Sequence, residues 1–432
     1  MPSTGVAIAI LLISFIILLM LKVPVTFSLA LSTVVTAIYY QVPLMTVMLK
    51  MVKGIESSSL MAIPFFIIAG EIMGAGGISR RLIEFANVMV GRVRGGLAQV
   101  NILASMFFGG ISGSAVADVS SIGAILIPMM KDNGYDDDYA VAVTVTSSCQ
   151  GVIIPPSHNM IIYSLAAGGG VSVGKLFLGG MVPGILLGVA LMILSYFIAV
   201  KRGYPKGEKI AFREKIKISF NAFFGLFTAV IIMGGVLTGV FTATESAAVA
   251  CLYAFIITFF VYREIPLKRM SQILYNALKT LALVLSLIAA AKAFGHMLAL
   301  LQVPALATNA LLTISDNKYV LLLLITLLVL LLGCIMDMAP LILILTPILL
   351  PVVTSLGMDP VHFGVVLILN LAIGLCTPPV GGALFVGCAV GKVSIEKMTK
   401  SLLPFYAVMV SVLILITLVP QVVMFVPNLL LK

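Results

Sequence analysis

Charged side chains are scarce in this sequence, and their scarcity excludes a water-soluble globular protein. Only 10% of the 432 residues are charged, whereas 61% are hydrophobic, and the mean hydropathy is +1.21. A soluble domain typically carries about 25% charged residues. Apolar runs long enough to cross a bilayer core of about 30 Å recur along the chain. Because these runs do not alternate with polar residues, they indicate helices and not barrel strands. Composition therefore predicts an all-α, polytopic membrane protein.

The sequence also lacks motifs typical of metal sites, of ATP hydrolysis and of acid–base catalysis. The five cysteines are scattered, without the spacing of a zinc site or a disulfide framework. No complete P-loop occurs, which argues against ATP hydrolysis. Histidine and glutamate do not cluster in the apolar segments, so we do not expect an enzyme. The net charge of +10 comes from Lys and Arg gathered in short loops, which favours membrane topology over nucleic acid binding. The first 22 residues lack a basic start and a cleavage site, and are interpreted as a span.

Basic loops set the expected topology. Residues 201–220 are interpreted as a cytoplasmic linker, because the stretch "KRGYPKGEKIAFREKIK" carries seven Lys or Arg against two Glu. Counted from this linker, residues 95–130 begin and end on the cytoplasmic side. A single helix over that segment would measure about 54 Å, too long for one crossing. We therefore expect a re-entrant hairpin whose polar tip "GGISGSA" (109–115) lies near the bilayer midplane, buried in protein or lining a wet cavity.

The second half of the chain repeats this plan. A second hairpin is expected at about 320–355, and helices broken by a Pro-Pro pair are expected at about 139–165 and 361–385. Each half then holds five crossings, an odd number, so the two halves enter the membrane in opposite directions. We therefore predict two inverted repeats over residues 1–200 and 221–432, each with about five transmembrane helices and one re-entrant hairpin.

Matching spacings support the internal repeat. Asp118 and Asp337 each precede a proline by ten residues, at Pro128 and Pro347. Each Pro-Pro pair also follows a glycine by twenty-one residues. One such match could arise by chance, because Gly and Pro are common in membrane helices. Several matches in one fixed register are better explained by repetition.

A few basic residues do not fit the expected topology. Lys50 and Lys53 fall on the outer side of the membrane, against the positive-inside rule. Lys292 and His296 stand one turn apart near the outer end of a span, where a long basic side chain can extend to the interface. We interpret that pair as interfacial, with a minor role in substrate binding as the alternative.

Inverted halves with paired hairpins and broken helices are typical of secondary transporters that bind substrate between the repeats. Exposed carbonyls at such breaks can coordinate Na⁺, and half-helix N-termini can meet an anion. The first half supplies Ser112 and Ser114 at its tip and Ser157 beside its break. The second half supplies Asp337 and Thr377. Oxygen-rich groups of this kind suit a hard monovalent cation.

Four ionisable residues need individual interpretation. Asp337 lies within an apolar segment, where a carboxylate is a functional hypothesis by default. For Asp118 two interpretations stay open: a functional carboxylate, or one that caps the second hairpin arm or pairs with a serine of the tip. Glu245 has the Thr-x-x-Glu spacing of a capping box, which favours a structural role. His158 follows the Pro-Pro break and either lines the cavity or only fills a polar position at a helix start.

Several blocks resemble the large membrane subunit of tripartite ATP-independent periplasmic (TRAP) transporters, the DctM-like family. These blocks are "IPFFIIAGEIM", "GISGSAVAD", "IIPPSHNMIIY", "GVFTATESAAVA", "MDMAP" and "TPPVGG". The resemblance implies a multi-pass protein of the bacterial inner membrane that imports an organic anion by Na⁺ coupling. It also implies an elevator, in which a transport domain moves against a scaffold. The partners implied are a periplasmic substrate-binding protein and a small four-helix, DctQ-like subunit, expected as a separate chain. Membrane lipid surrounds the complex.

The resemblance, with the matching motifs, also assigns site residues. Substrate is expected at Ser112, Ser114, Ser157 and Asp337. Na⁺, the coupling ion, is expected at Gly110, Ser112, Ser148, Gly151, Gly333, Asp337, Gly374 and Thr377. The anion stays open among C4-dicarboxylates, sialic acid and other sugar or keto acids. An alternative is a stand-alone, Na⁺-coupled divalent-anion symporter or ion exchanger with a similar inverted-repeat fold. A channel or an intramembrane enzyme is a more distant alternative.

Overall fold

The computed structural model describes residues 2–207, 209–315 and 317–430, and its regular structure is helical throughout, besides one isolated bridge between Arg94 and Lys206. Six of the described helices are long and apolar enough to cross a membrane, or seven if one bent pair counts as a span. The all-helical membrane class is therefore confirmed. The ten full crossings expected from the sequence are not all present as long helices, because many of the apolar helices have only 10–17 residues.

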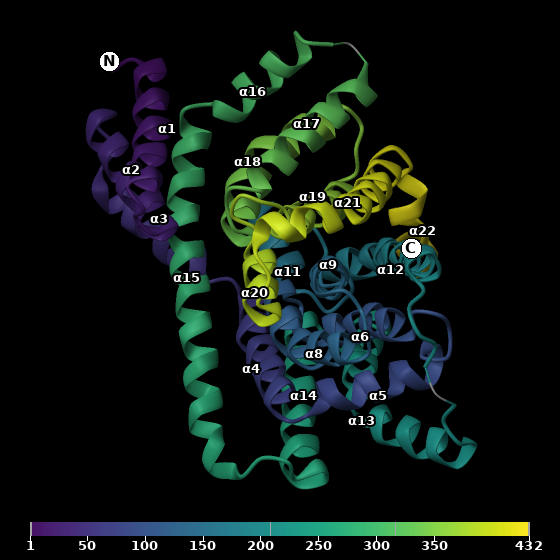
Figure 1. Cartoon of the computed structure of the whole chain (residues 1–432). Helices are drawn as coiled ribbons and strands as arrows, with labels where there is room; N and C mark the ends of the chain where they lie inside the picture. The colour runs from purple at the N-terminus through teal and green to yellow at the C-terminus, as the bar shows by residue number, and fades with distance from the viewer. Residues whose placement is uncertain (1, 208, 316, 431–432) are drawn as a thin grey trace.

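The first 90 residues of the chain form five helices that lead to the first hairpin segment (Figure 1). They are α1 (Thr4–Met20), α2 (Val25–Tyr39), α3 (Leu44–Ile55), α4 (Ala62–Ala75) and α5 (Ile78–Val90), with a short 3-10 turn, η1 (Ser58–Met61), before α4. The axis bends by 71° between α4 and α5. Gly77 adopts a left-handed conformation at this bend, with φ of 70°, which an L side chain rarely adopts.

A helix–turn–helix segment occupies the position of the first predicted hairpin. Its first arm is α6 (Gly96–Ser112), and its second arm runs through α7 (Ala115–Asp118), a π-helical turn η2 (Val119–Gly123) and α8 (Ala124–Asp132). The broken helix follows as α9 (Asp137–Ser147), α10 (Gln150–Ile153) and α11 (His158–Ala166), and α12 (Val173–Arg202) closes this half.

The second half repeats the helix–turn–helix segment followed by a broken helix, but four described helices precede them and two follow, against five and one in the first half. It starts with α13 (Phe212–Leu237), α14 (Ala243–Ile256) with its π-helical end η3 (Ile257–Tyr262), the turn η4 (Leu267–Arg269), the long α15 (Met270–Leu300) and α16 (Val303–Leu312). The second helix–turn–helix segment is α17 (Lys318–Gly333) and α18 (Met338–Ser355), and the second broken helix is α19 (Pro360–Leu375) and α20 (Gly382–Gly391). The chain ends with α21 (Ile395–Leu418) and α22 (Pro420–Leu430).

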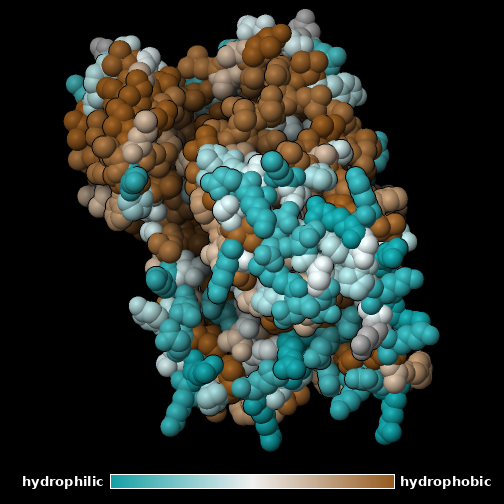
Figure 2. Space-filling model, in the orientation of Figure 1, coloured by the Kyte–Doolittle hydropathy of each residue, from teal (hydrophilic) through white to brown (hydrophobic). Residues whose placement is uncertain are grey.

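Helix α15 separates two regions of the molecule. It packs against α2, α3, α4 and α18, and in Figure 1 the purple helices α1–α3 lie on one side of its upper half, with α4 and α18 on the other side. In the same view, Figure 2 shows apolar side chains over the upper part, where α1–α3 and α16–α18 lie, and hydrophilic ones gathered over the lower front. The cavity described below lies between α15 and the first helix–turn–helix segment.

The start of the basic linker is fixed to the broken helix of the first half. Arg202 Nη1 lies 2.6 Å from Asp136 Oδ2, and the Tyr204 hydroxyl donates to the same oxygen at 2.7 Å. The hydrogen bond from Tyr204, together with the Arg202 guanidinium, lowers the pKa of Asp136 below its usual value. This contact holds the end of α12 against the start of α9.

Candidate functional site

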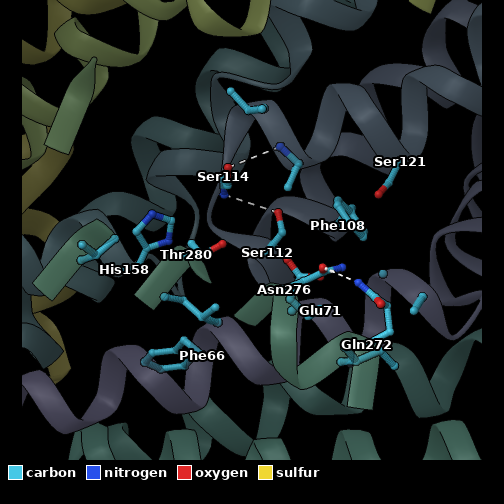
Figure 3. Close-up of a pocket in the computed structure, with 18 of the residues that line it drawn as sticks. Phe66, Glu71, Phe108, Ser112, Ser114, Ser121, His158, Gln272, Asn276 and Thr280 are labelled. Atoms are coloured by element: carbon cyan, nitrogen blue, oxygen red, sulfur yellow. Dashed lines mark hydrogen bonds between the residues drawn. The ribbon is translucent and has the colours of Figure 1, made fainter. Parts of the chain in front are cut away.

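A large cavity lies where the first helix–turn–helix tip faces α4 and α15, and we call it the tip cavity (Figure 3). Its volume is about 860 Å³. Three groups of side chains line it: Phe66 and Glu71 from α4, Ser112, Ser114 and Phe108 from the tip, and Gln272, Asn276 and Thr280 from α15. His158, the first residue of α11, completes this polar lining. A cavity of this size with a few convergent polar groups is the usual form of a small-molecule site.

The geometry of the tip depends on one glycine. Gly113 ends α6 with φ of 61°, and a Cβ at this position would lie 3.1 Å from the His158 ring and 3.2 Å from the Pro156 carbonyl. Ser114 then caps α7 by accepting a hydrogen bond from the Ala117 amide at 3.3 Å. Gly113 therefore lets the tip turn tightly against the broken helix, so that Ser112 and Ser114 line the cavity.

A strip of polar side chains on α15 faces the tip. Gln272, Asn276 and Thr280 follow one another at intervals of four residues and all line the cavity, so they share one face of the helix. Gln272 donates to the Asn276 side-chain oxygen at 3.0 Å. These three residues were not predicted as site residues, because the sequence of the segment indicates only a membrane span. The spacing of four in an otherwise apolar helix was the signal that could have found them.

Charge is distributed unevenly in the tip cavity. Lys268 and Arg269, in the turn η4 directly before α15, line one end of the cavity. Glu71 is the single carboxylate among the described lining residues. His158 lines the cavity rather than only filling a position at the helix start, as one of its two interpretations predicted. The cationic end, together with the hydroxyl and amide groups, makes the cavity suitable for an organic anion.

Each helix–turn–helix segment touches the broken helix of its own half through a pair of glycines. A Cβ at Gly109 would lie 1.9 Å from Gly151 Cα, and a Cβ at Gly374 would lie 2.5 Å from the Gly333 carbonyl carbon. The backbones therefore meet directly, as small residues permit in membrane helices. One carbonyl oxygen lies close to each contact, because a Cβ at Gly374 would also lie 2.7 Å from the Gly333 oxygen and a Cβ at Gly151 would lie 3.7 Å from the Ser105 oxygen.

The hydroxyl groups near the two breaks differ in their partners. Ser148 donates to the Val145 carbonyl at 2.7 Å, and Thr377 donates to the Ile373 carbonyl at 2.8 Å. Ser157 is buried and its Oγ finds no partner among the described residues. Gly110, beside the first tip, is packed so that a Cβ would lie 3.1 Å from the Pro155 carbonyl oxygen. A hydroxyl thus lies near each break, and those of Ser148 and Thr377 each donate to a carbonyl of their own segment.

The second tip does not reach the tip cavity. Asp337 is exposed, caps the start of α18 and accepts a hydrogen bond from the Met338 amide at 2.9 Å. Thr377 and Ser157 are likewise absent from the lining of the cavity. The structure therefore brings together Ser112, Ser114 and His158, and it places Asp337 with the second break, where the Val380 amide donates to the Cys334 carbonyl at 3.0 Å.

Asp118 is buried behind the first tip. It does not cap the second arm, because Ser114 does so, and neither carboxylate oxygen forms a hydrogen bond of normal geometry among the described residues. The Ser105 hydroxyl of α6 is its electrostatic neighbour, and Ser105 in turn lies 3.1 Å from the Ser147 hydroxyl. The interpretation of Asp118 as a cap is thus wrong, and its carboxylate belongs to a buried polar group between α6, α7 and α9.

Glu245 has the structural role that its spacing predicted. Its side chain accepts from the Thr242 amide at 2.7 Å, and its own amide donates to the Thr242 hydroxyl at 3.2 Å. This reciprocal pair is the capping box that starts α14. Glu245 is absent from the described lining of the tip cavity.

Comparison with known proteins decides the family. The family model "Tripartite ATP-independent periplasmic transporter, DctM component" matches residues 12–422. The chain belongs to the DctM family. It is 43% identical to the sialic acid TRAP transporter large permease protein SiaM of Vibrio cholerae over 88% of each chain. It is 36% identical to the C4-dicarboxylate large permease DctM of Rhodobacter capsulatus, over 98% of this chain and 99% of that one.

A solved structure shares the fold at low identity. The YdaH transporter of Alcanivorax borkumensis superposes with a TM-score of 0.61 at 14% identity, over 83% of this chain and 84% of that one. Members of the DctM family are transporter permeases of the membrane, and the family works with a small membrane subunit and a periplasmic binding protein. DctM membership thus explains why the polar groups converge on a cavity within an apolar protein.

Proposed function

We propose that the chain is the large subunit of a Na⁺-coupled importer of an organic anion in the bacterial inner membrane. The observation that carries this proposal is the tip cavity, where Ser112 and Ser114 face a polar strip on another helix and Lys268 and Arg269 supply positive charge. The substrate is a carboxylate of the class transported by relatives, namely a sialic acid, a C4-dicarboxylate or another sugar or keto acid.

The sodium ions are assigned to the two glycine contacts. Gly110, Ser112, Ser148 and Gly151 form the first site, and Gly333, Asp337, Gly374 and Thr377 form the second. Support comes from the carbonyl oxygen close to each contact, that of Ser105 at the first and of Gly333 at the second, and from the hydroxyls of Ser148 and Thr377 beside them. Na⁺ prefers such oxygen ligands at helix breaks. Two bound cations would also offset the negative charge of the substrate.

The movement that we propose is an elevator between two inverted repeats. The two helix–turn–helix segments and the two broken helices form the moving unit, and α1–α4 with α13–α15 form the scaffold. Support comes from the helix–turn–helix segment followed by a broken helix in each half and from the position of the tip cavity between α15 and the first tip. Alternating access by one unit moving against the other is the usual mode of such folds.

Uptake by proteoliposomes tests this function. The vesicles contain the chain and its small subunit, the cognate binding protein is outside, and radiolabelled N-acetylneuraminate or succinate is supplied with an inward Na⁺ gradient. We expect accumulation that disappears when K⁺ replaces Na⁺. Equal uptake in K⁺ would contradict sodium coupling. Uptake by the chain without the binding protein would favour the stand-alone symporter or exchanger instead.

A further inference from the structure

Three basic side chains, one from α3 and two from α15, lie close together beyond the tip cavity. Lys50 of α3 and Lys292 and His296 of α15 line a separate cavity of about 250 Å³. Twelve residues of α15, about 18 Å of helix, separate Lys292 from Thr280 of the tip cavity. The remaining walls are small or apolar: Ala166, Ala291, Gly295, Leu343 and Pro347. This second cavity therefore joins the helices assigned above to the scaffold with the end of α11 and with α18.

Close packing of α3 on α15 directs Lys292 into the protein. A Cβ at Gly54 would lie 2.7 Å from Lys292 Cγ, so glycine is needed where the lysine stem passes. The ammonium group donates to the Leu165 carbonyl at 2.8 Å, at the last turn of α11. Lys292 is therefore held at the end of α11, and its position relative to the membrane interface stays a prediction.

No negative charge balances this cluster. None of the residues that line the cavity is acidic, and none of the ion pairs among the described residues includes Lys50, Lys292 or His296. The Lys50 ammonium is also close enough to His296 for the two to interact electrostatically. Lys292 is half-buried, whereas Lys50 is exposed. A partly desolvated ammonium group without a counter-charge is unfavourable unless an anion joins it.

We infer that Lys50, Lys292 and His296 form an outer site for a carboxylate, which binds there before it reaches the tip cavity. The inference rests on the organic-anion transport proposed above. Lys292 exchanges the Leu165 carbonyl for the carboxylate, Lys50 supplies a second positive charge, and His296 donates an N–H. The site also explains why lysine is retained on the outer side, against the positive-inside rule.

Protection of an introduced thiol tests the site without requiring transport. In the purified two-subunit complex, Ala166→Cys places a thiol in the wall of the cavity, and its reaction with N-ethylmaleimide is followed by mass spectrometry. Succinate and N-acetylneuraminate are the probes, and uncharged succinamide is the control. A probe at ten times its Kd should slow the reaction about tenfold. Thr313→Cys, exposed at the end of α16, should react at an unchanged rate.

Two substitutions of Lys292 separate binding from a structural tether. Lys292→Gln keeps an amide donor for the Leu165 carbonyl and loses the charge, whereas Lys292→Met loses both. Each is combined with Ala166→Cys. We expect the probes not to protect the introduced thiol in Lys292→Gln or Lys292→Met, and to protect it in Lys292→Arg, which keeps the positive charge. Only Lys292→Met should have a lower thermal stability.

Failure of this inference is distinct from failure of the proposed function. If neither acid protects the thiol of the Ala166→Cys variant, or if protection persists when Lys50→Gln and Lys292→Gln are added, the outer site is wrong even where the wild-type complex transports. If wild-type vesicles show no Na⁺-driven uptake, the proposed function is wrong, and protection by an acid then still shows an anion site.

Discussion

Gly374→Ala is expected to reduce uptake to background and to destabilise the protein, whereas Gly333→Ala, at the same contact, should keep wild-type stability. A Cβ at Gly374 would lie 2.5 Å from a backbone carbon of Gly333, but a Cβ at Gly333 would lie 3.4 Å from its nearest neighbour, Gly374 Cα. Overpacking against atoms that cannot rotate away typically costs about 1–3 kcal/mol. Thermal unfolding of the purified protein and uptake by proteoliposomes measure both effects.

Two further glycines serve as controls for this prediction. Gly109→Ala should be as damaging as Gly374→Ala, because its Cβ would lie 1.9 Å from Gly151 Cα. Gly234→Ala should be neutral or slightly stabilising, because the helical position has open space around it and alanine favours the helix. Wild-type uptake by Gly374→Ala, or equal damage from Gly333→Ala, would show that the glycine contact does not determine how the second tip packs.

Asp337→Asn is expected to fold like wild type but to lose Na⁺-driven uptake. Asparagine retains a side-chain oxygen that can accept from the Met338 amide, so α18 stays capped. The negative charge that we assign to the second sodium site is lost. Asp337→Ala should lose uptake as well, and should also lose about 0.5–2 kcal/mol of stability with the cap.

The pair of variants separates the two roles of Asp337. Initial uptake rates are measured over a series of Na⁺ concentrations, and thermal unfolding is measured on the same preparations. If Asp337→Asn transports with the wild-type Na⁺ dependence, the carboxylate acts only as a helix cap. In that case the assignment of Asp337 to the ion and substrate sites is wrong.

The helix boundaries could be predicted well from sequence because Gly, Ser and Pro interrupt apolar runs at defined places. The segment predicted at 95–130 is α6 to α8, over residues 96–132, and it turns at Gly113. The break predicted within 139–165 lies at the Pro-Pro pair between α10 and α11. The entry of these segments into the membrane from one side stays a prediction.

The composition of the cavity could not be predicted in the same way. Gln272, Asn276 and Thr280 occupy one face of the 31-residue helix α15. Only the tertiary packing of the helices determines that this face lies against the first tip. The sequence also grouped Ser112 with Asp337 because both stand in matching motifs. In the structure Ser112 lines the tip cavity and Asp337 caps a helix outside it, so equivalence in a repeat did not imply proximity in space.

Lys292 illustrates the same limit. Position along the chain predicted an interfacial lysine but not its partner. Because Gly54 has no side chain, α3 approaches so closely that the Lys292 ammonium group donates to the Leu165 carbonyl at the end of α11. The contact depends on residues far apart in the sequence. Such contacts become visible only when the helices are assembled.

The central claim is that the two halves have opposite orientations and that each contains one re-entrant hairpin, which enters and leaves the membrane on the same side. Single cysteines at four exposed hairpin ends test it most directly, with a membrane-impermeant maleimide applied to each side of oriented vesicles. The four positions are Arg94, Asn133, Lys318 and Thr354. We predict that cysteines at Arg94 and Asn133 are labelled only from the cytoplasmic side, and those at Lys318 and Thr354 only from the periplasmic side. Labelling of the two ends of one hairpin from opposite sides would contradict the account.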